Sequence, residues 1–211
     1  MKHRTPWEEA ARIARTYVER LAPYCERIEV AGSVRRRKAE VGDIEIVAIP
    51  RSIIMRDLFG LEHEQGTQMD EGGVAALLEA GAKTIKNGPR YKQFLLPEGV
   101  SLDLFLVRQP AQWGVLLGIR TGPSEVSQML VSPRRRGGLL PAGYVVRDGA
   151  VWQQGYVPLA MPEEEDFFKF LGLPWIAPED RNRKHLLQAL REALGTRTPR
   201  ETAFVSNVLR R

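Results

Sequence analysis

Apolar residues recur at two different spacings along the chain, and the two spacings predict different elements. From residue 10 to residue 21 they recur every three or four positions, after a capping box Thr5-Pro6-Trp7-Glu8 that would put Pro6 at the first helical position. This predicts a helix that ends before Pro23. Strand-like patterns, with apolar and polar residues alternating in the longer ones, cover residues 28–31, 41–49, 91–96 and 101–107. These segments predict a sheet with at least one helix packed against it.

The remaining segments predict more helices and a hairpin. Helical patterns cover residues 53–59, 74–80 and 161–171, two short stretches around Thr121-Gly122-Pro123, and a further segment after residue 182. The polar stretch 61–73 predicts a loop. Asp148-Gly149, a favoured two-residue hairpin turn, joins two short strand patterns. This mixture of strands and helices predicts an α+β fold.

The composition is that of an ordinary globular protein, with 211 residues of which 43% are hydrophobic and 27% charged. That length allows one large domain or two small ones. The single cysteine, Cys25, excludes an intramolecular disulfide and fits a reducing compartment. The charged N-terminus does not resemble a signal peptide, and apolar runs are too short to span a membrane. We therefore expect a cytoplasmic protein without a membrane partner.

The positive charge is unevenly distributed. Residues 181–211 hold eight Lys or Arg and two acids, a net charge of +6, so residues 1–180 contribute about −1 to the total of +5. Two further cationic runs, 35–38 and 134–136, lie within the nearly neutral part. A single run is most simply a solvated face, but three runs favour a polyanionic partner such as nucleic acid.

Carboxylates interrupt two of the apolar strand patterns. Asp43 and Glu45 fall on one face of their strand because side chains alternate, and Asp103 lies in a later strand. A carboxylate on a half-buried strand is costly unless a cation accompanies it. A salt bridge to an arginine would satisfy each acid, and a metal site is the alternative.

The neighbouring residues favour the metal site. Gly32-Ser33 supplies backbone amides and a hydroxyl for phosphate oxygens, and Arg36 supplies positive charge. Magnesium takes oxygen ligands, commonly carboxylates together with substrate phosphates. Two such ions about 3.5–4 Å apart can assist an in-line phosphoryl displacement. The combination predicts nucleotidyl transfer.

The order of these motifs resembles that of the DNA polymerase X family, whose best-known member is DNA polymerase β. Gly32-Ser33 followed by Gly42-Asp43-Ile44-Glu45 resembles the family's nucleotidyltransferase motif, and 101–104 resembles the strand that carries its third acid. Residues 114–129 resemble the turn and helix beneath the incoming nucleotide. The hairpin and the run from 163 to 181 resemble the end of the thumb. The resemblance extends from about Arg4 to Arg181.

The resemblance implies a domain order and a fold. Residues 1–109 would form the palm, a nucleotidyltransferase subdomain with a mixed β-sheet and helices. Residues 110–181 would form a small α/β thumb, and 182–211 a basic helical tail outside the resemblance. The N-terminal lyase domain and the fingers of larger relatives would be absent, as in the minimal, virus-encoded members of the family.

The resemblance also implies site residues. Asp43, Glu45 and Asp103 would be catalytic and would bind two Mg²⁺ ions, for which Mn²⁺ could substitute. The nucleotide would be held by Gly32, Ser33, Arg36, Gly42, Arg4, Thr121, Gly122 and Ser127. DNA would be held by Arg134, Arg135, Arg136, Arg183 and Lys184.

Two departures from the family pattern change the expectations. The second acid is Glu45 where the family normally has Asp, which predicts unusual use of manganese. Ile119-Arg120 replaces a pair of aromatic residues that pack on the incoming sugar. Their loss predicts weaker exclusion of ribonucleotides.

The function implied by the resemblance is that of a DNA-directed DNA polymerase. It would add a dNMP from a dNTP to a primer 3′-hydroxyl, release pyrophosphate, and fill short gaps during DNA repair. Its partner would be gapped or primer-template DNA, and it would act as a monomer in the cytoplasm or, if viral, in the host cytoplasm. Two alternatives remain: a template-independent, terminal-transferase-like nucleotidyltransferase, and a non-catalytic nucleic-acid-binding protein. All three acids are present, which argues against the second.

Overall fold

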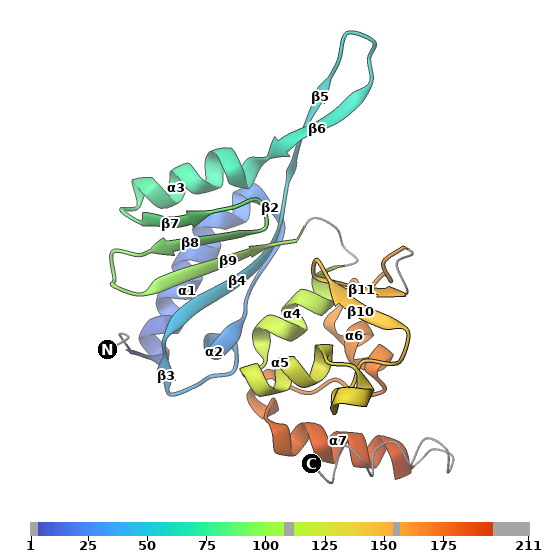
Figure 1. The fold of residues 1–211 in the computed structure, drawn as a ribbon. Helices are drawn as coiled ribbons and strands as arrows, with labels where there is room; N and C mark the ends of the chain where they lie inside the picture. Colours follow the sequence, from blue (N-terminus) through green and yellow to red (C-terminus); the bar gives the residue numbers. More distant parts are fainter. Residues whose placement is uncertain (1–3, 108–111, 154–156, 196–211) are drawn as a thin grey trace. The chain divides into compact units, whose positions relative to one another are not determined.

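The computed structural model describes residues 4–107, 112–153 and 157–195 (Figure 1). The chain divides into two compact units, residues 1–108 and residues 109–211. The predicted junction at residues 109 and 110 and the tail from residue 196 onward lie outside the described residues. No helix in the described ranges is both long enough and apolar enough to cross a membrane.

Unit 1 is built on a mixed five-stranded sheet with the order β2-β4-β9-β8-β7 (Figure 1). The strands are β2 (Cys25–Val30), β4 (Asp43–Pro50), β7 (Lys83–Asn87), β8 (Tyr91–Leu95) and β9 (Ser101–Leu106). β4 and β9 are parallel, and the other neighbouring strands are antiparallel. The sequence did not predict β7, because this edge strand is polar and exposed along its whole length and so carries no alternating pattern.

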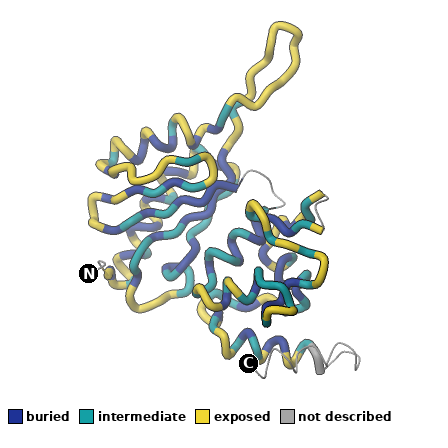
Figure 2. The backbone as a smooth tube through the Cα atoms, in the orientation of Figure 1, coloured by how far each residue is buried: buried dark blue, intermediate teal, exposed yellow. Residues whose placement is uncertain are grey.

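Two helices cover one face of this sheet (Figures 1 and 2). Helix α1 (Trp7–Leu21) lies where a helix was predicted, but Pro6 is its N-cap rather than its first residue, and the predicted side-chain cap is not formed. Helix α3 (Val74–Glu79) continues a single π-helical turn, η2 (Met69–Gly73). The core between the helices and the sheet includes Ile13, Leu21, Ile44, Ile46, Leu77, Leu102 and Leu104. The shorter elements of the unit are β1 (Thr5–Pro6), which pairs with β3 (Glu40–Val41), η1 (Ala22–Tyr24) and α2 (Gly32–Arg35).

The predictions of a helix over 53–59 and of a loop over 61–73 were wrong. The chain instead forms an antiparallel ribbon of β5 (Ser52–Arg56) and β6 (Glu62–Thr67), which projects from the rest of unit 1 (Figure 1). The β-branched pair Ile53-Ile54 suits a strand, and a hydrogen-bonded turn at Asp57 reverses the chain. Local apolar spacing could not reveal that the polar segment after the turn supplies the second strand.

Unit 2 has its own apolar core, and Figure 2 shows that its helices carry buried positions. Its elements are α4 (Trp113–Thr121), α5 (Ser124–Val131), η4 (Arg134–Arg136), β10 (Tyr144–Arg147), β11 (Ala150–Gln153), α6 (Glu164–Leu171), η5 (Pro178–Asp180) and α7 (Arg183–Gly195). The predicted hairpin is confirmed, with Asp148 and Gly149 both at positive φ in its turn. Leu186 and Leu190 of α7 are buried, so this helix contributes to the core of unit 2.

A buried ion pair stabilises the segment between α6 and α7. Arg181 is 3% exposed, and its Nη1 donates to Glu164 Oε1 at 2.5 Å, while its Nε donates to the carbonyl of Ile176. Trp175 Nε1 donates to the other oxygen of Glu164. A buried charge is tolerated only when it is paired in this way, so the pair ties the segment after α6 back onto that helix.

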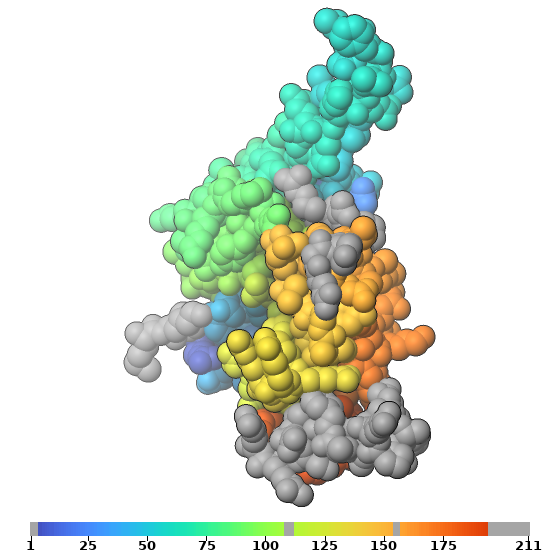
Figure 3. All heavy atoms as spheres, turned by 45° about the vertical axis from the view of Figure 1, so that its right-hand side comes forward, coloured from blue at the N-terminus to red at the C-terminus, as the bar shows by residue number. Residues whose placement is uncertain are grey.

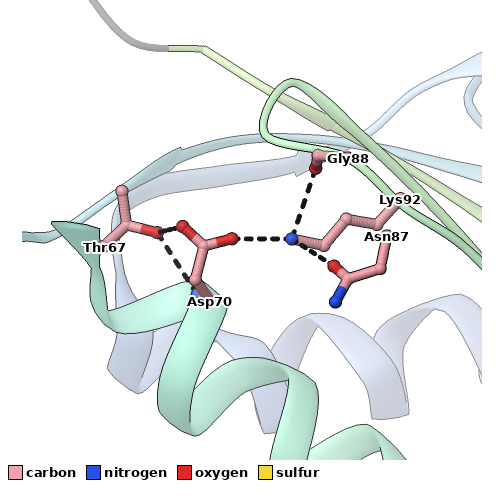
Figure 4. Close-up of polar contacts among 5 residues, drawn as sticks. All are labelled: Thr67, Asp70, Asn87, Gly88 and Lys92. Carbon is pink, nitrogen blue, oxygen red and sulfur yellow. Dashed lines mark hydrogen bonds and ion pairs between the residues drawn. The ribbon is translucent and has the colours of Figure 1, made fainter.

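A second buried cation lies in unit 1, on the core side of the sheet (Figure 4). Lys92 of β8 is 1% exposed, yet its ammonium group has three acceptors. They are Asp70 Oδ1 at 2.6 Å, Asn87 Oδ1 at 2.5 Å and the carbonyl oxygen of Gly88 at 3.3 Å. Thr67 Oγ1 donates to the second oxygen of Asp70 at 2.7 Å. The network joins β8, the turn after β7 and the start of η2.

Cys25 provides a probe of the opening of unit 1. Its side chain is buried, and this burial raises the pKa of the thiol to about 12. The thiol is therefore neutral as well as inaccessible at pH 8, and only an opened molecule exposes a reactive thiolate. The rate of alkylation consequently reports the free energy of opening.

We predict that Lys92 and Asp70, the ion pair of unit 1, contribute unequally to the free energy of unfolding. Asp70→Asn leaves the buried ammonium group of Lys92 with neutral acceptors only, which destabilises the protein. Because Asp70 is partly exposed, the loss should be about 2 kcal/mol, less than for a fully buried pair. Lys92→Met keeps most of the packing and leaves a carboxylate that water can reach, so it should cost less than about 1 kcal/mol. Urea unfolding and the rate of Cys25 alkylation measure the loss of stability in both variants. A larger loss for Lys92→Met would contradict this account.

Candidate active site

The three predicted catalytic acids lie on one face of the sheet of unit 1. In the parallel pair, Glu45 of β4 is directly opposite Asp103 of β9, and Asp43 is opposite Ser101. Side chains alternate along a strand, so all three acids point to the same face. The intervening Ile44 is fully buried beneath α1 and α3 on the other face. The acids therefore lie on the face opposite the helices.

Asp103 is oriented by two side chains of the adjacent strand β8. Gln93 Nε2 donates to Asp103 Oδ1 at 2.8 Å, and the hydroxyl of Tyr91 donates to the same oxygen at 3.1 Å. Both donors point to the acid-bearing face because Gln93 is paired with Asp103 across the antiparallel ladder. Neither residue was predicted from the sequence to belong to the site. The alternation in 91–95 would have placed them on one face, but not beside Asp103.

Gly32 allows the Gly-Ser turn to approach Glu45 closely. Its φ is +63°, and a Cβ at this position would lie 2.0 Å from Glu45 Oε2. The amide of Ala31 donates to the backbone oxygen of Glu45 at 2.8 Å, which holds the turn against β4. The carboxylate of Glu45 therefore lies against the Cα of Gly32, where any other residue would collide with it.

Ser33 carries a buried hydroxyl that lacks a hydrogen-bond partner within the described ranges. Leaving a buried polar group unsatisfied is unfavourable and calls for an explanation. A bound acceptor, such as a phosphate oxygen, would satisfy it. Arg36 caps the C-terminal end of the same short helix α2, and Arg4 Nη1 lies within van der Waals reach of a Cβ built on Gly42. The turn thus combines a donor with nearby positive charge.

The donor types suit a hard divalent cation, but the acids are not gathered into a preformed cluster. Across the residues that the structure describes, no group of three or more His, Cys, Asp or Glu side chains lies close enough to hold a metal ion. Asp43 and Glu45 take part in other polar interactions. Three carboxylates on one face, two of them on directly opposed positions, nevertheless provide the oxygen ligands that magnesium prefers.

The other predicted site residues belong to unit 2. Thr121 is buried at the end of α4, Gly122 follows it, and Ser127 lies in the first part of α5. Ser127 Oγ donates to the carbonyl of Ile119 at 2.6 Å, so this hydroxyl has a partner within its own unit.

The predicted DNA-binding residues of unit 2 lie at its surface. Arg135 and Arg136 are exposed in η4, whereas Arg134 is half-buried and its Nε donates to the carbonyl of Leu139. Arg183 and Lys184 are exposed in the first turn of α7. All five are therefore cationic groups at least partly accessible to a polyanion.

A comparison with known protein families matches residues 139–182 to the DNA polymerase beta thumb. The matched segment contains the β10–β11 hairpin, α6 and the Glu164–Arg181 ion pair. A thumb of this kind suggests a nucleotidyltransferase. The match assigns residues 139–182 to the thumb of the DNA polymerase X family, the family predicted from the sequence. A search of the curated proteins found no match to the chain.

The match does not extend to the residues that carry the acids. It lies wholly in unit 2, so the assignment of residues 1–109 as a palm remains a prediction. The same holds for the roles of the individual site residues. A mixed α+β architecture with a five-stranded sheet, by contrast, is what the structure has.

We predict that Gly32→Ala destabilises unit 1 and displaces the carboxylate of Glu45. The left-handed backbone and the collision should together cost about 2 kcal/mol. Gly42→Ala is the matched control, because its Cβ would meet only Arg4 Nη1 at 3.6 Å and should cost less than about 0.5 kcal/mol. Cys25 alkylation measures both. Adding Glu45→Ala to Gly32→Ala should recover part of the loss; no recovery would show that Glu45 is not the obstacle.

Proposed function

We propose that the protein is a DNA-directed DNA polymerase that adds a dNMP to a primer 3′-hydroxyl and fills short gaps during repair. One observation carries the proposal: Asp43, Glu45 and Asp103 share one sheet face beside the Gly32-Ser33 turn, in a chain with a DNA polymerase beta thumb. A carboxylate face and a phosphate-binding turn are the two parts that nucleotidyl transfer requires.

Asp43, Glu45 and Asp103 would hold two magnesium ions, with manganese as a substitute. The ions, when bound, supply positive charge that stabilises the charge developing on the phosphoryl oxygens. Glu45 is one methylene longer than the family's usual Asp, and its carboxylate already lies against Gly32. We expect this difference to affect the choice between magnesium and manganese.

The reaction forms one P–O bond and breaks another. As the primer 3′-oxygen attacks the α-phosphorus of the nucleotide, its proton would pass to Asp103. The bond from the α-phosphorus to the bridging oxygen breaks, and pyrophosphate departs. Gln93 and Tyr91 hold Asp103 so that its second oxygen can face the 3′-hydroxyl. The buried hydroxyl of Ser33 would donate to a triphosphate oxygen, and Arg36 and Arg4 would supply positive charge.

A DNA polymerase beta thumb implies DNA binding. In the proposed complex, the exposed cations Arg135, Arg136, Arg183 and Lys184, together with Arg134, contact DNA phosphates. Such contacts release counterions, so affinity for primer-template DNA should fall steeply as salt rises.

A second candidate function is template-independent addition of nucleotides, as by a terminal transferase. Ser127, at the position predicted to contact the nucleotide base, instead donates to Ile119 within its own unit. A base-contacting group that is already engaged would weaken selection by the template. Ile119 and Arg120 in place of aromatic residues would similarly weaken discrimination against ribonucleotides.

We predict that the pure protein extends the primer of a one-nucleotide gap with the templated base, and that Asp103→Asn lowers this rate by roughly 100- to 1,000-fold. Glu79→Gln, an exposed acid on α3, is the matched control and should leave the rate unchanged. Labelled primers on gapped, open and single-stranded DNA, each with magnesium or manganese, give the measurement. Equal extension of the bare strand with any nucleotide would favour the second candidate, and full activity of Asp103→Asn would exclude the proposed site.

Ser33→Ala separates nucleotide binding from folding. The hydroxyl has no partner to lose within the described ranges, so the variant should be at least as stable as the wild type without substrate. It should nevertheless raise KM for the nucleotide by roughly 10- to 100-fold, the effect of losing a hydrogen bond to a charged oxygen. Cys25 alkylation and steady-state primer extension give the two readouts. A destabilised variant with unchanged KM would mean that the hydroxyl has a structural partner.

A further inference from the structure

The tip of the β5–β6 ribbon exposes large apolar side chains, and no part of the proposed reaction uses them. Leu58 is fully exposed, Phe59 is 89% exposed and Leu61 is 60% exposed. Figure 3 shows the tip standing clear of the rest of unit 1, and Figure 2 shows that the ribbon is exposed along most of its length. Contiguous exposed apolar groups of this kind usually mark an interaction surface.

The tip is a preformed structure. Asp57 Oδ1 accepts hydrogen bonds from the amides of Phe59 at 2.8 Å and Leu61 at 2.9 Å, and its Oδ2 lies 3.0 Å from His63 Nε2. These bonds, with His63 first, hold the pKa of Asp57 below its usual range. Gly60 completes the turn with a φ of +80°. A preformed turn loses little conformational entropy when it docks.

The charge around the tip indicates what kind of surface it could meet. The ribbon from 52 to 67 contains one cation, Arg56, and three acids, Asp57, Glu62 and Glu64, a net charge of −2. Such a surface is repelled by nucleic acid and by anionic lipid. It is suited to an apolar pocket with a basic rim on a protein.

Unit 2 contains an apolar pocket whose lining includes two arginines. It has a volume of about 360 Å³, within the range of roughly 300–1,000 Å³ that is usual for binding pockets. Its accessible wall is almost entirely apolar, and Arg134 and Arg135 contribute to its lining. The apolar part of the lining comes from Pro133, Pro141, Ala142, Tyr144 and Val145. Two arginines beside an apolar hollow complement the apolar, acidic tip.

We propose that the ribbon tip of one chain docks into this pocket of a second copy, with Phe59 and Leu58 entering the hollow and the acids of the ribbon facing Arg134 and Arg135. Tip and pocket are different surfaces, so an assembly of docked copies still has one free tip and one free pocket at its ends. The contact is therefore head-to-tail, and assemblies lengthen as protein concentration rises. This departs from the monomer that the sequence predicted, and it does not depend on the proposed polymerase activity.

Sedimentation velocity of the nucleic-acid-free full chain over a concentration series tests the proposal. The wild type should show an average mass that rises with concentration. A tip variant, Leu58→Ser with Phe59→Ser, should be monomeric throughout, as should a pocket variant, Ala142→Glu, which places a carboxylate in the apolar hollow. Leu78→Ser, which changes an exposed leucine on α3, is the matched control and should associate like the wild type. Val145→Glu provides an independent pocket variant, and thermal melting verifies that each variant is folded.

Mixing the two defective proteins gives the decisive result. The intact tip of the pocket variant can enter the intact pocket of the tip variant, so an equimolar mixture should form a complex of one copy each and grow no further. A monomeric wild type overturns the proposal, as does a tip or pocket variant that still associates. A mixture that stays monomeric also overturns it, because the intact tip of one variant and the intact pocket of the other should pair.

Discussion

The candidate site depends on the parallel pairing of β4 with β9. This pairing places Glu45 directly opposite Asp103 and leaves Asp43 one pleat away on the same face. A shift of the register by one residue would turn Asp103 toward the apolar core, where a carboxylate could not be hydrated. The buried residues Ile44 and Leu102 oppose such a shift, so the same packing that stabilises unit 1 also sets the positions of the acids.

The sheet of unit 1 has two chemically distinct faces. On the core side, the buried cation Lys92 is matched by Asp70, and α1 and α3 cover the apolar residues. On the other side, Gln93 and Tyr91 orient Asp103, and Gly32 brings the Gly-Ser turn against Glu45. Because alternate residues of β8 serve both faces, this single strand supports the core and positions the candidate site at once.

In unit 2 a buried ion pair, rather than strand pairing, fixes the segment after α6. The segment after α6 has little regular structure, and the buried pair Glu164–Arg181 holds it in place with Trp175. This segment lies within the region matched to the DNA polymerase beta thumb. The ribbon tip of unit 1 and the apolar pocket of unit 2 are separate from the candidate site. The tip is apolar and acidic and the pocket is apolar with two arginines in its lining, and neither contributes a residue to the carboxylate face.

Local pattern by itself determined a large part of the protein. Alternation placed Asp43 and Glu45 on one face, and Asp148-Gly149 specified the hairpin of unit 2, because both signals come from neighbouring residues. The prediction from local pattern was wrong for residues 53–59, because the strand and helix periods are hard to distinguish over a short apolar run. Only the tertiary structure decided that β4 pairs with β9, that Gln93 reaches Asp103, and that the hydroxyl of Ser33 is buried. These are contacts between residues far apart in the chain, and they form only when the whole sheet packs.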